Sequence, residues 1–507
     1  MRSLWQFLRD LRRCLSLRRK IRRISHSDSK SGHIVFNTVS YYNFDAFIGE
    51  NYCAYLLACC GYTVTMLIDD FQMAQGEIIQ VTHGPDDYRK YNSFKNRLYR
   101  AVYILMIRGV FRHPRIKVTR YSRLLQKAGP KLELTKADQR HVDASVLRYF
   151  QSAKVDLNDA GEKKYHDATT ENARISKTIG RYVASQLNPD LFFTTHGIYA
   201  SWGPAYDQLR EHAIPCLIYG WGSYLWPTVH VTNTSFFYMS ESDLWLEFQG
   251  RKLGEAELLR LDDYFAKRFG GKAIDTSMYL RGVDADAHVE IDTSPAGHVI
   301  GMFPNVIWDA NLPERNIVFE NAVDWIVKTI RFVETRPELH LIVRYHPSEA
   351  TLMSYAKKMG PLVEARIPNL ASIKNVTILP SNAKVRTYTL LKDYVDIGLV
   401  YESMLGLELP YLGIPVLTVA KSRYRGVGNS FEPRNEEEYF RLLGQPEKLL
   451  SDFKAGTFRE RAIFYAYFYL FESAWPLPIF DEKRYSQVNF EVDVKELDPA
   501  FNQKITK

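Results

Sequence analysis

Two segments in the second half of the chain combine side chains suited to holding a nucleotide. The segment RYHPSE contains Arg344 and His346, which can donate hydrogen bonds to phosphate oxygens. The segment YESMLGLE contains Ser403, whose hydroxyl can hold phosphate at the start of a predicted helix, and Glu408, which can accept from the hydroxyls of a ribose. Other roles are open for each of them: a surface turn for the first segment, helix capping for Ser403 and an ordinary surface carboxylate for Glu408.

A basic loop adds three cations to this set. The segment KSRYRGVG contains Lys421, Arg423 and Arg425, directly after a predicted strand at 416–419. All three segments follow predicted strands, and in an open α/β sheet the carboxyl ends of the strands face the ligand crevice. One such segment alone would fit a solvated loop, but three at successive strand ends indicate a phosphate-bearing ligand.

The elements that must position these segments alternate between strand and helix in both halves of the chain. In the first half we predict strands at 33–38, 62–68, 190–195 and 215–219, and helices at 46–60 and 201–212. In the second half we predict strands at 299–303, 339–344, 376–379, 396–401 and 416–419, and helices at 316–333, 384–392 and 403–412.

This alternation predicts the α/β class, with two Rossmann-like domains facing a central cleft. Residues 85–175 lack the pattern and are interpreted as a helical insertion in the N-terminal domain. The predicted division of the chain is a tail at 1–30, an N-terminal domain at 31–290, a C-terminal domain at 296–440, and C-terminal helices that cross back at 441–507.

The order of the motifs resembles that of capsule-polysaccharide biosynthesis glycosyltransferases of the GT-B fold, including Kdo-transferases. The motifs are HGxYxxWG from His196, FPNVxWD from Phe303, RxHPxE from Arg344, YxSxxGLE from Tyr401, GxPV from Gly413 and YRGxG from Tyr424. The resemblance covers roughly residues 34–475. Two positions depart from it: Met404 stands where a second hydroxyl residue is common, and Pro410 where Ala or Ser is more usual.

The resemblance implies that the C-terminal domain binds a nucleotide-sugar donor, with His346 and Ser403 at the donor phosphate and Glu408 at the ribose. It implies transfer of the sugar to a polysaccharide or lipid-linked glycan acceptor during capsule or cell-surface glycan synthesis. Enzymes of this fold stabilise the leaving phosphate with helix dipoles and basic side chains, so no metal and no cofactor are expected.

An inverting transfer needs a base for the acceptor hydroxyl, and the N-terminal domain offers His196, Asp45 and Glu50. His196 lies in a predicted strand-end loop and has an ordinary pKa suited to the role, although a histidine bonded to backbone would look the same. Aromatic side chains that could stack on sugar rings, or equally belong to the core, are Tyr199, Trp202 and Trp221.

Three other functions fit parts of the same pattern. A CDP-glycerol-type polymer phosphotransferase would share the histidine-proline and serine motifs. A nucleotide-sugar epimerase would need neither an acceptor nor a basic tail. A non-catalytic polysaccharide-assembly protein would bind no nucleotide.

Composition and charge set the outer limits. The chain has 507 residues, of which 46% are hydrophobic and 24% charged, as in globular proteins of roughly two to four domains. The net charge of +8 lies entirely in residues 1–23, and the remainder is balanced, which argues against a nucleic-acid-binding body. The five cysteines are interpreted as buried, reduced side chains.

The basic tail predicts an amphipathic helix at 4–24. Its apolar side chains are Leu4, Phe7, Leu8, Leu11, Leu15, Ile21 and Ile24. Such a helix can lie in the headgroup plane of an anionic membrane, and no stretch of the chain is long enough to span one. We therefore expect a cytoplasmic protein at the inner face of the membrane. The alternatives for the tail are a solvated charge run, a targeting segment or a nucleic-acid contact.

Overall fold

The computed structural model describes residues 4–24, 31–38, 44–75, 77, 93–152, 154–222, 228–234, 236–271, 289–294, 296–308, 313–351, 357–476 and 479. For some of them, Asp45 and Trp221 included, only the backbone is described. The chain forms two compact units. Unit 1 holds residues 1–149, 156–236 and 473–507, and unit 2 holds residues 150–155 and 237–472.

Unit 1 is built on a seven-stranded sheet with the order β12-β6-β5-β4-β1-β2-β3. Its strands are β1 (His33–Thr38), β2 (Thr63–Ile68), β3 (Ile116–Arg120), β4 (Leu191–Thr195), β5 (Cys216–Gly222), β6 (Thr228–Thr232) and β12 (Ala474–Pro476). The five strands from β5 to β3 are parallel, whereas β6 and β12 are antiparallel to their neighbours. The run from Ile34 to Thr38 is buried throughout, as a central parallel strand requires.

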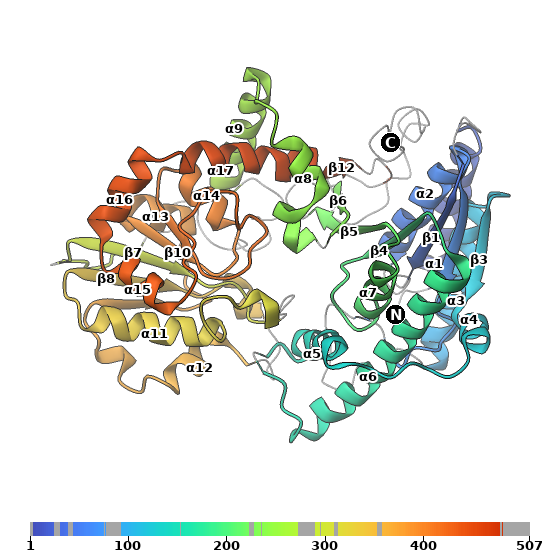
Figure 1. Cartoon of the computed structure of the whole chain (residues 1–507), viewed down its shortest axis with the longest axis horizontal. Coiled ribbons are helices and arrows are strands. Elements are labelled where there is room, and N and C mark those ends of the chain that lie inside the picture. Colours follow the sequence, from blue (N-terminus) through green and yellow to red (C-terminus); the bar gives the residue numbers. More distant parts are fainter. Residues whose placement is uncertain are drawn as a thin grey trace. The chain divides into compact units, whose positions relative to one another are not determined.

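Helices connect these strands and cover the sheet (Figure 1). They are α1 (Leu4–Ile21), α2 (Phe44–Cys59), α3 (Phe94–Val110), α4 (Tyr121–Ala128), α5 (Lys136–Phe150), α6 (Ala160–Tyr182), the π-turn η2 (Val183–Leu187) and α7 (Gly203–Glu211). Helix α6 approaches α7 closely because Gly180 has no side chain: a Cβ there would lie 2.6 Å from the Cα of Ala205.

Unit 2 is built on a five-stranded sheet in which every strand pair is parallel, with the order β11-β10-β7-β8-β9. The strands are β7 (His298–Phe303), β8 (Leu339–Arg344), β9 (Val376–Leu379), β10 (Ile397–Val400) and β11 (Val416–Thr418). Separate apolar clusters lie on the two faces of this sheet. One lies under α11 (Ala322–Glu334), α12 (Met359–Glu364) and α15 (Glu436–Leu443), and the other under α13 (Thr387–Tyr394) and α14 (Leu405–Tyr411).

The α-helices of unit 2 are α8 (Asp243–Phe248), α9 (Glu255–Phe269), α11 (Ala322–Glu334), α12 (Met359–Glu364), α13 (Thr387–Tyr394), α14 (Leu405–Tyr411), α15 (Glu436–Leu443), α16 (Pro446–Ala455) and α17 (Phe458–Tyr467). Its shorter turns are η3 (Phe236–Glu241, whose first residue belongs to unit 1), η4 (Pro313–Arg315), η5 (Pro347–Thr351), η6 (Leu370–Ser372) and η7 (Phe468–Glu472).

The predicted α/β class with two Rossmann-like domains is confirmed by these two sheets. The placement of the domains around a cleft stays a prediction. The interpretation of 85–175 as a purely helical insertion is wrong in one respect, because this range contains β3, which pairs with β2. Only Ile116 of β3 is buried, so this edge strand lacks the apolar run by which the other parallel strands were predicted.

The units divide near residue 236, whereas the sequence favoured a boundary at 281–295. Residues 237–269 belong to unit 2 because they pack on its C-terminal helices. The ring of Trp245 contacts Tyr465 and Phe468, and Arg268 forms a buried ion pair with Glu408 of α14. Helices α15 to α17 also belong to unit 2, and the chain returns to unit 1 as a strand, β12, which pairs with β6.

The predicted N-terminal helix is confirmed as α1, but part of its apolar face is used inside unit 1. Leu17, Ile21 and Ile24 are buried, and α1 packs along α3, while Leu15 keeps half of its surface exposed. All five cysteines are buried, and none of them forms a disulfide bond. None of the helices in the described part of the chain is long and apolar enough to cross a membrane.

The buried ion pair between Arg268 and Glu408 gives a prediction about stability. Glu408 is 1% exposed, and its two oxygens accept from Arg268 Nε at 2.5 Å and Tyr388 Oη at 2.8 Å. Glu408→Gln leaves a buried guanidinium without its anion, so we expect the free energy of unfolding to fall by about 3–5 kcal/mol. Urea denaturation measures this loss.

Lys267→Gln is the matched control, because Lys267 lies on the same helix and pairs with Asp263 at an exposed position. We expect its loss to stay below about 1 kcal/mol. Equal losses in the two variants would contradict the assignment of Glu408 to the packing of α9 against α14.

Candidate functional site

The predicted phosphate-binding segments lie at one edge of the unit 2 sheet. His346 follows β8, Ser403 follows β10 and Lys421 follows β11, and Asn305 follows β7 between them. All these strands are parallel, so their carboxyl ends share one edge. Along the chain, the strands are added outward from β7 through β8 to β9, and the next strand, β10, pairs with the other side of β7. The strand order therefore reverses between β7 and β10, which is a topological switch point. Ligands of such sheets usually bind at this point.

His346 is half-buried and its ring is oriented by the turn that follows it. The backbone N–H of Ser348 donates to His346 Nδ1 at 3.2 Å, and Ser348 Oγ lies 2.6 Å from the same nitrogen. Because Nδ1 accepts from an N–H, the proton of the neutral ring belongs on Nε2. His346 is therefore prepared to act as a hydrogen-bond donor through Nε2.

Arg344 does not join this edge as the sequence predicted. Its side chain is buried, and Nη1 donates to the carbonyls of Tyr345 and Pro380, at 3.1 and 2.6 Å, while Nη2 donates to Ala383 at 3.2 Å. Burial lowers the pKa of the Arg344 guanidinium to about 10. The guanidinium holds the loop after β9 against β8, so the phosphate role passes to His346 alone.

Ser403 lies just before α14 and is half-buried. Its Oγ accepts from the N–H of Leu405 at 3.3 Å, and its carbonyl accepts from Tyr424 Oη at 2.7 Å. The tyrosine reaches that carbonyl because Gly406 leaves room for its ring. The bond from Leu405 is one that a helix-capping side chain makes, so the helix-capping alternative for Ser403 stays open beside the phosphate role.

Two further predicted donor-binding residues are committed to the fold. The Glu408 carboxylate is bound by Arg268 and Tyr388, which corrects both the ribose role and the surface-carboxylate alternative. The guanidinium of Arg425 donates to the carbonyls of Thr418, Ala420 and Pro433 at 3.0–3.4 Å, and burial lowers its pKa. Both side chains are hydrogen-bonded to groups of the fold. Either one could bind a ligand only if those hydrogen bonds were broken.

The remaining cations of the basic loop stay close to the edge of the sheet. Lys421 Nζ pairs with Glu241 at 2.8 Å and lies over the ring of Tyr238. Arg423 Nη1 donates to Tyr469 Oη at 2.6 Å. Both side chains are half-buried, so each can exchange its present partner for an anion at a smaller loss than a fully buried cation.

A buried set of side chains that the sequence analysis missed ties these loops together. Glu402 pairs with Arg315 and also accepts from Asn305 Nδ2 at 2.9 Å. The carbonyl of Arg315 accepts from the N–H of Lys421 at 2.8 Å. This set links the loops after β7, β10 and β11 across the switch point. Its only signal in the sequence is the position of Asn305 and Glu402 inside two of the motifs.

Unit 1 has its own switch point, between β1 and β4, and His196 is the first residue after β4. His196 and Gly197 have positive φ values of 53° and 67°, which turn the chain sharply at the end of the strand. The half-buried ring of His196 stacks on Trp202, with ring centroids 5.4 Å apart. The residues directly after β1, at 39–43, lie outside the described residues.

The structure corrects or leaves open the other predictions made for unit 1. Tyr199 and Trp202 are buried and pack inside the loop, Tyr199 under the guanidinium of Arg148, so neither presents a face for sugar stacking. Glu50 of α2 is buried and accepts from the hydroxyl of Tyr219. The side chains of Asp45 and Trp221 lie outside the described residues.

Side chains of α5 and α6, together with Glu77, hold the loop at 196–203 through polar contacts at consecutive residues. The N–H of Ala200 donates to Ser145 Oγ at 2.9 Å, and the N–H of Ser201 donates to Glu77 Oε1 at 3.0 Å. Ser176 Oγ donates to the carbonyl of Ser201 at 3.2 Å. These hydrogen bonds therefore fix the backbone of the loop, and His196 is its first residue.

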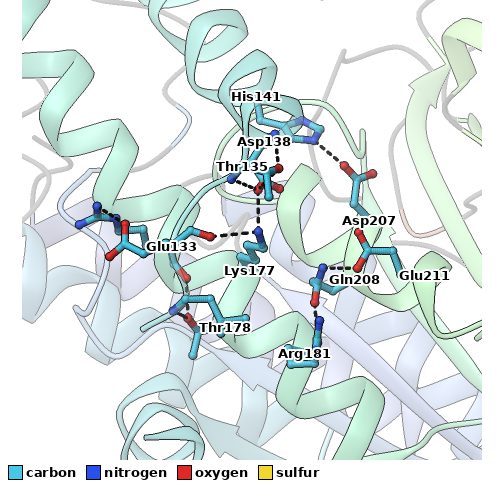
Figure 2. A network of polar contacts seen from close by, with 12 residues as sticks. Glu133, Thr135, Asp138, His141, Lys177, Thr178, Arg181, Asp207, Gln208 and Glu211 are labelled. Carbon is cyan, nitrogen blue, oxygen red and sulfur yellow. Dashed lines mark hydrogen bonds and ion pairs between the residues drawn. The ribbon is translucent and has the colours of Figure 1, made fainter. Parts of the chain in front are cut away.

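His141 of α5 adds a charged contact to this support (Figure 2). It is 1% exposed; Nδ1 donates to the carbonyl of Ile198, and Nε2 lies 2.9 Å from Asp207 Oδ2. Burial alone would raise the pKa of Asp207, but hydrogen bonds from His141 and Arg140 hold it below its usual value. The carboxylate of Asp207 is therefore the acceptor in its contacts with His141 and Arg140.

Figure 2 also shows how α5 is attached to α6. Lys177 Nζ donates to Asp138 Oδ2 at 2.7 Å and to the carbonyl of Glu133 at 3.0 Å. Asp138 accepts in addition from the N–H and hydroxyl of Thr135 at the start of α5. Burial alone would raise the pKa of Asp138, but the hydrogen bonds from Lys177 and Thr135 lower it. The start of α5 is thus anchored by a buried ion pair.

No group of three or more His, Cys, Asp and Glu side chains that could hold a metal ion occurs among the residues that the structure describes.

Comparisons with known proteins give matches at low sequence identity and low TM-score. No family model matches the chain, and no curated protein matches it significantly. A β-Kdo 2,7-transferase, KpsC of Thermosulfurimonas dismutans, is 15% identical with a TM-score of 0.33 over 61% of this chain and 84% of its own. The UDP-GlcNAc 2-epimerase of Neisseria meningitidis, bound to UDP-GlcNAc, is 11% identical with a TM-score of 0.27, covering 88% and 99%.

A glycosyltransferase of kitacinnamycin is 14% identical with a TM-score of 0.24, covering 88% of this chain and 98% of its own. These proteins differ among themselves in activity. At such identities and TM-scores, the function of this chain has to be argued from its own residues.

The contacts of His141 predict that it stabilises the loop at 196–203. His141→Leu leaves the carbonyl of Ile198 and the carboxylate of Asp207 without this donor, so we expect a loss of about 1–3 kcal/mol in the free energy of unfolding. His212→Leu is the control, because His212 is exposed and its ring contacts the carbonyl of Gln208, four residues back along the chain. Urea denaturation of both variants is the measurement, and a loss no larger than that of the control would refute the role.

Proposed function

We propose that the protein is a glycosyltransferase of the GT-B type that moves a sugar from a nucleotide-sugar donor to a polysaccharide or lipid-linked glycan acceptor. The context proposed is capsule or cell-surface glycan synthesis, in the cytoplasm at the inner face of the membrane. One observation carries the proposal: His346, Ser403 and Lys421 follow three strands of one parallel sheet and lie at the same edge, on both sides of its switch point.

The type of side chain at this edge supports a phosphate-bearing donor. His346 offers Nε2–H, Ser403 a hydroxyl and Lys421 an ammonium group, and Arg423 lies two residues further along the basic loop. Such donors bind the negative charge that develops on a leaving phosphate or diphosphate as the bond to the sugar breaks. In this proposal they take the place of a metal ion.

His196 is proposed as the base that removes the proton from the acceptor hydroxyl as its oxygen attacks the sugar. The ring is only half-buried and lies at the switch point of the unit 1 sheet. Its loop is fixed by contacts to α5 and α6. Glu50 is less suited to this step, because its carboxylate is buried against Tyr219.

Donor binding is tested first with CMP, CDP, UDP, GDP and ADP, each of which raises the midpoint of thermal unfolding if it binds the folded protein. We expect one clear responder. For that nucleotide, His346→Ala and Ser403→Ala should each weaken binding by roughly tenfold, because each removes one hydrogen bond to phosphate.

His298→Ala is the matched control for donor binding, because His298 begins β7 at the opposite end of the same sheet. It should leave the affinity unchanged. A folded protein that responds to none of the five nucleotides would favour the non-catalytic assembly protein.

The role of His196 is tested by turnover. His196→Ala should lower kcat by roughly 10²–10⁴-fold, the usual contribution of a general base, while the affinity for the nucleotide stays unchanged. Turnover should also persist in EDTA. His212→Ala, an exposed histidine of the same unit, is the control, and wild-type rates in the His196 variant would remove it as the base.

A further inference from the structure

A basic cavity of about 820 Å³ lies in unit 1, outside the site described above. It is lined by α1 and the residue that follows it, by α3 and the turn after α3, and by one residue each from α2 and β3. Its polar lining consists of Arg18, Arg22, Arg108, Arg112, His113 and Tyr55. No aspartate or glutamate is among the described residues that line it.

The four arginines of this cavity form no ion pair with a carboxylate in the described part of the chain. Arg108 Nη1 donates to Asn51 Oδ1 at 3.0 Å, a neutral partner, and its Nε is buried without a hydrogen bond among the described atoms. Burial lowers the pKa of Arg108 to about 10. Cations gathered in a partly enclosed space without an anion raise the local potential and favour a ligand that carries a negative charge.

The two helices that line the cavity also carry exposed apolar side chains. On α3, Phe94, Leu98 and Leu105 are 83%, 56% and 72% exposed, and their spacing of four and seven residues places them on one face of the helix. Leu105 also lines the cavity, and Leu15 of α1 is 50% exposed. Four large exposed apolar side chains on the two helices that line a basic cavity are unusual for a surface that meets only water.

We propose that this face docks on an anionic membrane, with the phosphate group of a lipid in the cavity and the exposed side chains of α3 at the boundary of the acyl chains. The charge of the cavity and the apolar side chains beside it argue for a lipid rather than a soluble phosphate. The inference rests on the proposed function in one respect: docking would bring the enzyme to a lipid-linked acceptor.

The proposed membrane-binding face differs from the one that the sequence predicted, which was the apolar face of the N-terminal helix. Leu17, Ile21 and Ile24 pack inside unit 1 and are not available to a membrane. Helix α1 instead contributes Arg18 to the cavity, and Arg22 follows directly after its end. Helix α3 supplies most of the exposed apolar side chains. Deleting residues 1–30 would expose the core beneath α1, so point variants of the full chain are the better test.

The experiment is co-sedimentation of the full chain with vesicles of phosphatidylcholine, with and without phosphatidylglycerol, in the absence of any nucleotide. We expect binding only to vesicles that contain phosphatidylglycerol. Arg22→Gln together with Arg112→Gln should lower the partition coefficient by roughly 25-fold, since each cation near an anionic surface contributes about fivefold. Both arginines are exposed, so the fold should tolerate the change.

Arg434→Gln together with Lys448→Gln is the matched control, because both side chains are exposed on unit 2 and the net charge changes equally. It should bind as the wild type does. Leu98→Ser together with Leu105→Ser should also weaken binding, which a purely electrostatic attraction would not require.

Three results would overturn the proposal: wild-type sedimentation of the arginine variant, an equal loss in the control, or stabilisation by glycerol phosphate without any vesicle binding. The last would assign the cavity to a soluble phosphate. Because no nucleotide is present, a negative result in the vesicle experiment does not affect the donor-binding prediction. Likewise, the absence of stabilisation by any of the five nucleotides does not affect the prediction of membrane docking.

Discussion

Parallel strand pairing is the constraint on which the candidate site depends. Every strand pair in the unit 2 sheet is parallel, so each strand must be followed by a crossover, and every loop that leaves a carboxyl end emerges at the same edge. His346, Ser403 and Lys421 are brought together in this way, although as many as 75 residues separate them in the sequence. The strand order decides which loops are neighbours, and it places the switch point between β7 and β10.

Buried charges then fix the loops that pairing has brought together. Glu402 with Arg315 and Glu408 with Arg268 are ion pairs inside unit 2, and Asp138 with Lys177 is the counterpart in unit 1. An ionised group inside a protein costs several kcal/mol unless a partner of opposite charge accompanies it. Such residues are held in place by their partners and serve to position the loops.

The same reasoning separates two kinds of cation in the phosphate-binding motifs. The guanidinium groups of Arg344 and Arg425 donate hydrogen bonds to backbone carbonyls. If either group bound a ligand instead, those carbonyls would lose their hydrogen-bond donor. His346 and Lys421 are half-buried and keep their polar groups close to the edge of the sheet. The arginines lining the cavity between α1 and α3 differ again, since no described carboxylate balances them.

The sequence by itself determined the class of fold and most of its central strands. A strand that is buried on both faces consists mainly of consecutive apolar residues, and such a run can be recognised in the sequence. His33–Thr38, Leu339–Arg344 and Val376–Leu379 were predicted to the residue. The half-exposed edge strand Ile116–Arg120 carries no such run, and the short strand Ala474–Pro476 is recognisable only once β6 is beside it.

Only the tertiary structure decided what each polar side chain does, because residue type fixes what a side chain can bind and its neighbours fix what it does bind. Glu408 suits a ribose by its chemistry, yet Arg268, 140 residues away, occupies it. Tyr199 suits a sugar ring, yet it is buried beneath Arg148. Leu17 and Ile21 suit a membrane, yet they pack inside unit 1. These partners are distant in sequence, and no local pattern records them.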